Sequence, residues 1–253
     1  MRVTVLGSGT IAHSPTRSCA AYYLETEGAR VLLDCGPGTA RRMAEHGIWW
    51  QEISHVVLSH FHIDHHLDLP ALLYAWKYGM LPRRSEPIDI IGPVGTKSLL
   101  EGLAAAHGDW VLDPGYPVRI TELAPGGTAE LGGARVDCLK VSHTPESMAY
   151  SLSLGGRRIV YSGDTGFDVA LADWAKGCDL LLLECSLPAS MAIVEHLTPE
   201  QCGELAQRSA PRLLVLTHLY PPVETVDIRA LVAVQFGGPV VIAHDGWTHE
   251  LRD

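Results

Sequence analysis

The feature that most constrains the fold is a dense polar run that follows directly on an apolar segment. Residues 53–59 are rich in β-branched side chains, which predicts a buried strand. The next residues read His60-Phe-His-Ile-Asp-His-His66. A solvated surface tract is not normally found at the mouth of an apolar strand. The pattern therefore predicts a functional site at the end of this strand, on the rim of a sheet.

Four of these side chains have the types and spacing of metal ligands. His60 and His62 are two residues apart, so an extended backbone points both the same way. Asp64 and His65 are adjacent, and they can diverge toward a second ion as the chain turns. Imidazole and carboxylate together suit zinc, while manganese and iron stay open from ligand type alone. The alternative is a histidine-rich tract that binds metal adventitiously.

Four residues cannot fill the coordination shells of two ions, so further ligands are expected at other strand ends. His143 follows the expected strand 135–142, Asp164 follows 157–162, and His218 follows 213–217. Each of these residues, taken alone, is more often structural. Their recurrence at three strand ends predicts that they lie on one rim with the first four.

Strand-like and helix-like segments alternate in both halves of the chain, and no linker separates the halves. This pattern predicts one α/β (α+β) domain over residues 1–253, with two sheets packed face to face and helices outside. Strands are expected at 3–6, 20–25, 30–33, 53–59, 88–91, 118–123, 135–142, 149–154, 157–162, 180–184, 213–217 and 240–243. Helices are expected at 39–46, 70–78, 96–107, 167–176 and 224–236, and one begins at the capping box Thr198-Pro-Glu-Gln201.

Composition narrows the classes of function. With 47% hydrophobic residues among 253, the chain can bury a sizeable core, and its net charge of −10 argues against general nucleic-acid binding. No apolar run approaches the roughly 20 residues that span a bilayer, and the short N-terminal strand does not resemble a signal peptide. The six scattered cysteines indicate free thiols. We expect a cytoplasmic protein with no membrane partner.

One glycine motif is a weak match to a nucleotide-binding loop. Gly7-Ser-Gly9-Thr-Ile-Ala12 fits the loose dinucleotide pattern, but His13-Ser-Pro-Thr16 interrupts the helix that this pattern requires. We interpret the segment as a tight turn from strand to loop.

The same residues carry a resemblance to a known family. The chain resembles the metallo-β-lactamase fold, specifically its tRNase Z and phosphodiesterase branch. The matching stretches are Leu6-Gly-Ser-Gly-Thr10 with Pro15 and Arg17, Leu33-Asp-Cys-Gly-Pro-Gly38, Ser59-His-Phe-His-Ile-Asp-His65, Ile91-Gly-Pro93, Val141-Ser-His143 with Tyr150, Ser162-Gly-Asp-Thr165, Leu183-Glu-Cys185, His196-Leu-Thr198 and Leu216-Thr-His218.

This resemblance implies a four-layer αββα sandwich with two zinc ions at the edge between the sheets. One ion would be held by His60, His62 and His143, and the other by Asp64, His65 and His218, with Asp164 bridging them. Two zinc ions roughly 3.5–4 Å apart can share a water, lower its pKa and supply a hydroxide nucleophile. The implied reaction is hydrolysis of a phosphodiester.

His196 is the expected catalytic proton donor, because it resembles the family's proton-donating histidine and precedes the capping box by two residues. Asp64, which is also an expected metal ligand, is the second residue that we predict to be catalytic. The alternative for His196 is a loop histidine that packs against the start of the helix.

Other residues near the motifs have weaker assignments. Asp34 and Glu184 are acidic residues at strand ends that we expect to contact ligating histidines. Tyr150 and Ser147 are assigned core or turn roles in preference to contact with a substrate phosphate. His66 is expected to face solvent or a backbone carbonyl.

The chain departs from familiar tRNases Z in the segment that should carry the basic tRNA-binding arm. Only 20 residues, 144–163, separate His143 from Asp164, and they predict a hairpin with its turn at Gly155-Gly156. A small cyclic, nucleotide or phosphosugar diester is therefore the expected substrate, and tRNA 3′ processing is less favoured. Lactone, thioester or other ester hydrolysis on the same metal pair stays an alternative. A homodimer is a further expectation from the resemblance.

Overall fold

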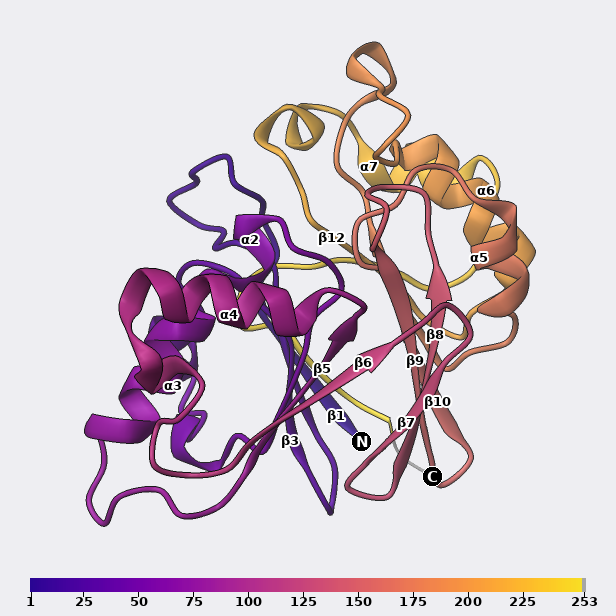
Figure 1. Ribbon diagram of the computed structural model, residues 1–253. Coiled ribbons are helices and arrows are strands. Elements are labelled where there is room, and N and C mark those ends of the chain that lie inside the picture. The colour runs from indigo at the N-terminus through magenta and orange to yellow at the C-terminus, as the bar shows by residue number, and fades with distance from the viewer. Residues whose placement is uncertain (252–253) are drawn as a thin grey trace.

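The protein has four layers, two central sheets and a layer of helices on each outer side. The computed structural model describes residues 1–251. In Figure 1 the first half of the chain, with α3 and α4, lies on one side, and the second half, with α5, α6 and α7, lies on the other. The backbone N–H of Leu251 donates to the carbonyl oxygen of Met1 at 2.8 Å, so the described chain returns to its N-terminus. This arrangement confirms the predicted αββα sandwich.

The strands and helices of the described chain have the following bounds. The strands are β1 Arg2–Gly7, β2 Ala21–Glu25, β3 Arg30–Cys35, β4 His55–Val57, β5 Ile88–Pro93, β6 Val118–Leu123, β7 Thr128–Leu131, β8 Ala134–Lys140, β9 Met148–Leu154, β10 Arg157–Tyr161, β11 Leu180–Glu184, β12 Leu214–Thr217, β13 Val240–Ile242 and β14 Thr248–Glu250. The α-helices are α1 Thr39–Glu45, α2 Ile63–His66, α3 Leu69–Tyr78, α4 Thr96–His107, α5 Val169–Trp174, α6 Pro199–Ser209 and α7 Ile228–Ala233.

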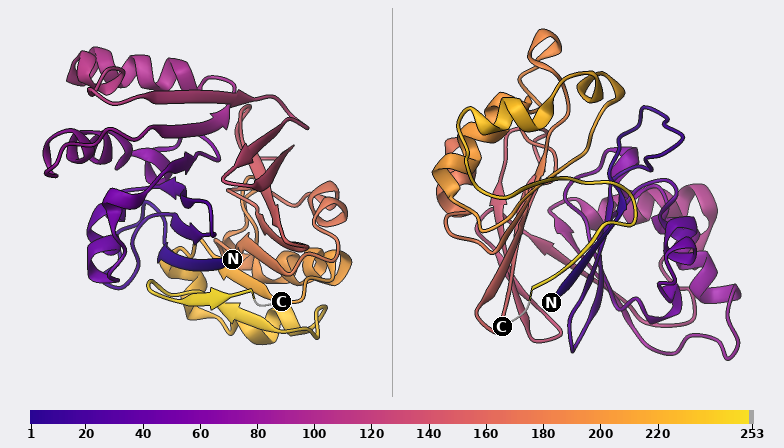
Figure 2. Two further views of the ribbon diagram at one scale, coloured as in Figure 1. Left: turned by 90° about the horizontal axis from the view of Figure 1, so that it is seen from below. Right: turned by 180° about the vertical axis from the view of Figure 1, so that it is seen from behind.

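Within residues 1–251 the strands form two seven-stranded mixed sheets. One has the order β14-β1-β2-β3-β4-β5-β6, and the other has the order β13-β12-β11-β10-β9-β8-β7. In the first sheet β3 to β6 are parallel, and in the second β10 to β13 are parallel. Parallel neighbours end at the same edge of a sheet. The loops that follow β3 and β4 in one sheet, and those that follow β10, β11 and β12 in the other, therefore lie on one rim. Figure 2 shows the two sheets from below and from behind.

Three hydrophobic clusters hold the layers together. The cluster between the sheets includes Tyr22, Leu33, Tyr150 and Leu182. A second cluster packs α5 to α7 against one sheet, and a third packs α1, α3 and α4 against the other. The central strand β11, with the sequence LLLLE, is buried along its whole length, as expected for a parallel strand covered on both faces.

Helix starts follow the expected local chemistry. Thr198 accepts a hydrogen bond from the backbone N–H of Gln201, and the Gln201 side chain accepts one from the N–H of Thr198, so the predicted capping box is present. Asp168 and Asp227 cap α5 and α7 more simply, since each side chain accepts one hydrogen bond from a backbone N–H of the first turn.

Several expected elements differ from the structure. The chain does not end its regular structure at residue 243, because β14 follows and pairs with β1. The strand β7 was not expected, and the predicted helix 224–236 is a 3₁₀ turn, Pro221–Thr225, followed by the short α7. The predicted strand 53–59 is hydrogen-bonded as a strand only over β4. Residues 63–66, expected as part of a polar loop, form the one-turn helix α2.

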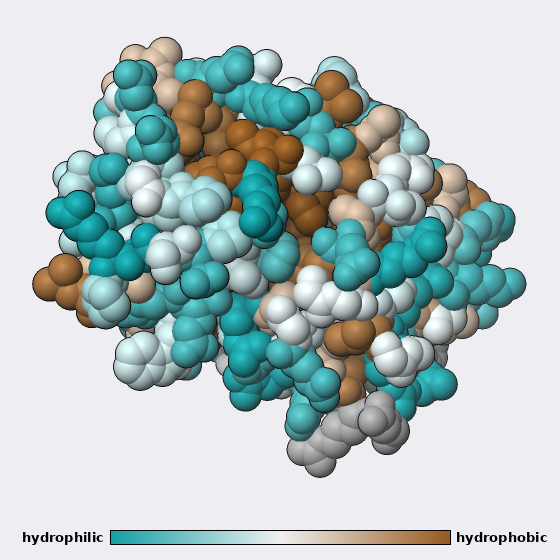
Figure 3. Space-filling model, turned by 60° about the horizontal axis from the view of Figure 1, so that its bottom comes forward, coloured by the Kyte–Doolittle hydropathy of each residue, from teal (hydrophilic) through white to brown (hydrophobic). Residues whose placement is uncertain are grey.

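The molecular surface carries both hydrophobic and hydrophilic residues. On the face in Figure 3, hydrophobic residues gather in a hollow in the upper half, and hydrophilic residues cover much of the rest. Among the described residues no helix is both long and apolar enough to cross a membrane.

A single domain over residues 1–253 stays a prediction, and its last two residues lie outside the described part.

Gly36 allows the loop after β3 to approach the polar run. A Cβ on Gly36 would lie 1.9 Å from the carbonyl oxygen of Asp64, a backbone atom that cannot turn aside. We expect Gly36→Ala to lower the free energy of unfolding by about 2 kcal/mol or more, as overpacking commonly does. Chemical denaturation measures this change.

Gly102 provides the control for this substitution. It lies in α4, and a Cβ there would have no neighbour within 4 Å. Gly102→Ala should be neutral or stabilise the protein by up to about 1 kcal/mol, because alanine is the better helix former. Equal destabilisation by both substitutions would show that the approach to Asp64 is not what selects glycine.

Candidate metal centre

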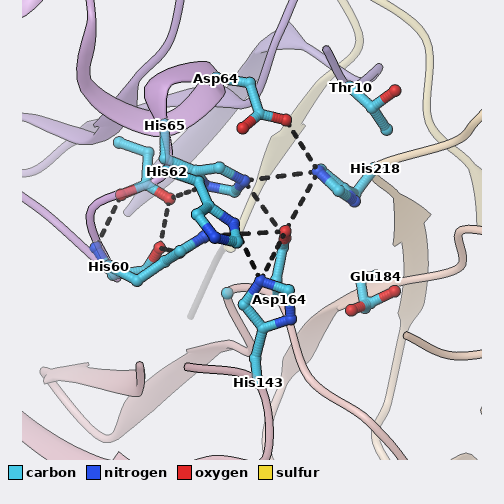
Figure 4. A network of polar contacts seen from close by, with 12 residues as sticks. Thr10, His60, His62, Asp64, His65, His143, Asp164, Glu184 and His218 are labelled. Atoms are coloured by element: carbon cyan, nitrogen blue, oxygen red, sulfur yellow. Dashed lines mark hydrogen bonds and ion pairs between the residues drawn. The ribbon is translucent and has the colours of Figure 1, made fainter. Parts of the chain in front are cut away.

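All seven predicted metal ligands lie together at the rim where the two sheets meet. His60 and His62 are in the loop after β4, and Asp64 and His65 are on α2. His143 follows β8, Asp164 follows β10, and His218 follows β12. Figure 4 shows their side chains pointing toward one another from both halves of the molecule.

The atoms of the seven predicted ligands fall into two groups around Asp164, and a third group, which consists of Asp164, His196 and His218, overlaps them. His60, His62, His143 and Asp164 form one group, and Asp64, His65 and His218 form the other, with the ligand atoms of each group within 4.8 Å of one another. Asp164 Oδ2 lies 3.8 Å from the Nε2 atoms of both His60 and His143, and 3.4 Å from Nε2 of His218. This carboxylate therefore faces both groups, as a bridging ligand would.

The distances between ligand atoms fit the coordination sphere of a cation. Two nitrogens at the usual zinc–nitrogen distance and the tetrahedral angle are roughly 3.3 Å apart. His143 Nε2 lies 3.1 Å from His62 Nδ1, and His65 Nε2 lies 3.4 Å from His218 Nε2. His218 Nε2 lies 3.6 Å from Asp64 Oδ2. These spacings match those expected when a metal ion separates the ligands.

Two buried atoms at the centre have no hydrogen-bond partner among the described residues. They are His60 Nε2 and Asp164 Oδ1, and both side chains are almost completely buried. Burying a polar atom without a hydrogen-bond partner costs free energy, so these two atoms need an explanation. The donor set and these orphaned atoms fit a site for one or two divalent cations.

The charges at the site also suit a cation. Burial holds the pKa of His60 well below its usual value, which keeps the ring neutral with a free lone pair. Burial raises the pKa of Asp64, but the hydrogen bond and charge of His218 outweigh this effect and bring the pKa to about 2. Burial has the same effect on Asp164, but His218 and His65 hold its pKa well below the usual range.

Asp34 supports the first half of the site from behind. Its Oδ2 atom lies 2.7 Å from His65 Nδ1, and it accepts hydrogen bonds from Ser59 Oγ and Tyr161 Oη at 2.7 and 2.6 Å. Ser59 Oγ lies 3.0 Å from His60 Nδ1. The expected contact of Asp34 with a candidate ligand, His65, is therefore present. Ser59 and Tyr161 were not predicted as supporting residues, although Ser59 directly precedes a ligand.

Glu184 has a different partner from the one expected. Its Oε1 atom lies 2.9 Å from Nδ1 of His196, and not next to a ligating histidine. Burial lowers the pKa of His196, but the hydrogen bond and charge of Glu184 outweigh it and raise the pKa to about 9. The ring centroid of His196 lies 4.9 Å from that of His143 and 5.5 Å from that of His218. His196 therefore stands beside the candidate ligands, and Glu184 favours the protonated form of its imidazole.

Two residues of the site have strained backbones. Asp34 and His218 both have φ of 55°, in the left-handed region that non-glycine residues seldom adopt. Such strain persists only where the surrounding structure holds it, and it occurs often at functional sites. In both residues it lies at the end of a strand, where the chain must turn to aim the side chain.

The remaining assignments from the sequence have clear outcomes. His66 Nε2 lies 3.1 Å from the carbonyl oxygen of Phe61, and Tyr150 Oη donates to the carbonyl of Leu58, so both are structural. Ser147 closes a turn with Thr144. All six cysteines lie among the described residues, buried and free. No helix follows the Gly7–Gly9 turn within the next ten residues, as predicted.

The comparison with protein families agrees with this geometry. Residues 29–219 match the Beta-lactamase superfamily domain. The chain belongs to this superfamily. Its members are hydrolases, and the predicted resemblance is confirmed.

Curated relatives cover most of the chain. It is 29% identical over 307 aligned positions to Ribonuclease Z of Myxococcus xanthus, covering 99% of this chain and 98% of that protein. It is 29% identical over 272 positions to Ribonuclease Z of Methanosarcina acetivorans, covering 87% of each. It is 30% identical over 256 positions to an uncharacterized protein of Mycobacterium tuberculosis, covering 100% of this chain and 93% of that one.

Solved structures share the fold over nearly the whole chain. The metallo-beta-lactamase fold protein YhfI from Bacillus subtilis superposes with a TM-score of 0.84 at 22% identity, covering 98% of each chain. The short form of human tRNase Z has a TM-score of 0.81 at 24% identity and covers 100% of each. A diphosphatase of the PhnP family has a TM-score of 0.72 at 21% identity, covering 99% of this chain.

Replacing one candidate ligand should remove metal. We expect His60→Ala and Asp164→Ala to lower the metal bound per chain, measured by elemental analysis, because each removes a buried ligand atom at the centre. His107→Ala, at the exposed end of α4, is the matched control and should keep the full content. Full metal content in both site variants would contradict the assignment.

Proposed function

We propose that this protein is a dinuclear zinc phosphodiesterase that hydrolyses small diesters, such as cyclic nucleotides, cyclic phosphosugars or short oligonucleotides. The observation that carries this proposal is the buried cluster of ligand atoms with the His196–Glu184 pair directly beside it. A metal pair and an adjacent proton donor are the two parts that hydrolysis of an alkyl phosphodiester needs.

The ligand set fits an anionic substrate. Divalent cations bound there would activate water and offset the negative charge of the phosphodiester. Two carboxylates, Asp64 and Asp164, neutralise only part of the charge of two such cations, so positive charge is left for the substrate. The backbone N–H of Ile11 donates to Asp64 Oδ2 at 3.0 Å, which fixes that carboxylate toward His218.

His196 is proposed to protonate the leaving oxygen. An alkoxide is a poor leaving group, and a positioned acid commonly contributes a factor of about 10²–10⁴ to such a step. Glu184 holds Nδ1 of His196, so the other ring nitrogen is left to give its proton to substrate. Glu184 is itself fixed by the backbone N–H groups of Thr165 and Leu197.

The segment between His143 and Asp164 favours a small substrate. Residues 148–161 form a plain antiparallel hairpin, in which Leu154 pairs with Arg157 across the two-residue turn. The alignment with the M. xanthus Ribonuclease Z runs over 307 positions, although this chain has 253 residues, so that relative carries additional segments. The alignment with the mycobacterial relative takes only 256 positions. A chain without those segments, with a net charge of −10, is poorly suited to hold tRNA.

Hydrolysis of a lactone or thioester is the second candidate, because the same cations would serve it. A thioester releases a thiolate, which is a better leaving group than an alkoxide and depends less on an acid. The Glu184–His196 pair therefore favours an oxygen ester with a poor leaving group.

His196→Ala should separate proton donation from metal binding. The variant should keep its metal and lose about 10²–10⁴ in kcat/KM on an alkyl phosphodiester, with a smaller loss on bis(p-nitrophenyl) phosphate, whose leaving group needs no acid. Because His196 also lies near Asp164 and His218, loss of metal would instead show that it is a ligand. An equal loss on both substrates would contradict proton donation.

A substrate panel tests the proposed class. The zinc-loaded protein should hydrolyse bis(p-nitrophenyl) phosphate and cyclic nucleotides with higher kcat/KM than lactones, thioesters or pre-tRNA. Asp164→Ala, assayed in parallel, identifies activity that does not come from this site. Specific trimming of pre-tRNA, or faster turnover of lactones, would overturn the proposal.

A further inference from the structure

A buried serine lies between the metal cluster and the proposed proton donor. Ser186 stands two residues beyond the end of β11 and is completely buried. Its Oγ atom lies 2.6 Å from Glu184 Oε2, 3.0 Å from His218 Nδ1, 3.0 Å from the carbonyl oxygen of His218 and 3.5 Å from His196 Nδ1. One hydroxyl group therefore touches both a candidate ligand and the carboxylate that holds His196.

Counting protons fixes the direction of these hydrogen bonds. His218 Nε2 faces His65, Asp64 and Asp164, so a cation at the site requires its lone pair there and its proton on Nδ1. This Nδ1–H must then donate to Ser186 Oγ. Ser186 has a single proton, and the shorter contact to a charged acceptor directs it to Glu184 Oε2.

We propose that Ser186 is a positioning residue that links His218 to His196: it accepts from His218 Nδ1 and donates to Glu184 Oε2, while Glu184 Oε1 accepts from His196 Nδ1. The hydroxyl fixes the tautomer and orientation of His218 and, through Glu184, the direction in which His196 presents its proton. The part concerning His196 rests on the proposed function. The part concerning His218 rests only on a cation at the site and not on the reaction that is catalysed there.

The other half of the site provides a matched comparison. Ser59 Oγ lies 3.0 Å from His60 Nδ1 and donates to Asp34 Oδ2 at 2.7 Å, which is the same order of histidine, serine and carboxylate. The two carboxylates differ in their other hydrogen-bond partners. Asp34 also contacts His65 and Tyr161, whereas Glu184 also contacts His196.

The test compares Ser186→Ala, Ser186→Thr and Ser59→Ala with wild type. Zinc affinity is measured by chelator competition, and kcat/KM is measured on a series of aryl and alkyl phosphodiesters. Ser186→Ala and Ser59→Ala should each weaken zinc binding by about 10–100-fold, the usual effect of losing a group that orients a ligand. Only Ser186→Ala should lose more activity as the leaving group becomes poorer. Ser186→Thr, which keeps the hydroxyl, should restore both properties.

A His196→Ala background separates the two roles of Ser186. In that background, adding Ser186→Ala should leave the dependence on the leaving group unchanged, while zinc affinity still falls. Wild-type zinc affinity in folded Ser186→Ala, or the same dependence on the leaving group in Ser186→Ala and Ser59→Ala, would overturn the linkage.

Failure of the proposed function gives a different pattern. If the wild-type protein hydrolyses no phosphodiester, the assigned substrate class is wrong, but the zinc affinities still decide whether Ser186 orients His218. Should Ser186→Ala not fold, Ser186→Cys, which keeps the size but donates weakly, replaces it in both measurements.

Discussion

The structure depends on the enforced closeness of seven ligand-type side chains, five of which belong to buried residues. Imidazole nitrogens stand 3.1–3.4 Å apart there, and buried atoms such as His60 Nε2 have no partner among the described residues. Gathering polar groups out of water costs free energy unless each finds a partner, and bound cations would provide such a partner. The strained backbones of Asp34 and His218 and the close approach at Gly36 are local costs of bringing them together.

Two carboxylates, one from each sheet, hold the side chains of this cluster in place. Asp34 from β3 holds His65 and, through Ser59, His60, and it also binds Tyr161 of the opposite sheet. Glu184 from β11 holds His196 and, through Ser186, His218. The parallel between the halves explains how a rim built from many loops can be rigid. The loops that carry His60, His65, His196 and His218 are bound to these two carboxylates, whereas His143 Nδ1 lies 3.0 Å from the backbone carbonyl oxygen of Glu195.

Much of the fold could be predicted because the chain obeys local rules. Buried parallel strands are continuous apolar runs, as in β11, and the capping box at Thr198 marks the start of α6. The failures are short or edge elements. The strands β7 and β14 are half-exposed, so they have no apolar run to reveal them, and β14 exists only because it pairs with β1 across the whole length of the chain. The one turn of α2 was hidden in a polar sequence, since its buried residues are two candidate ligands, Asp64 and His65, and a structural histidine, His66.

The sequence by itself determined the types of the candidate ligands, their order and their positions at strand ends, because these depend on residue identity and on the polarity of neighbouring segments. Only the tertiary structure decided which atoms meet. Glu184 serves His196, Ser186 and Ser59 complete hydrogen-bonded chains, and Tyr161 crosses between the sheets to Asp34. Such contacts join residues up to 127 positions apart and depend on side-chain direction within a packed interior. No local pattern encodes them, because the partner of a buried hydroxyl is selected by the three-dimensional arrangement of several strands at once.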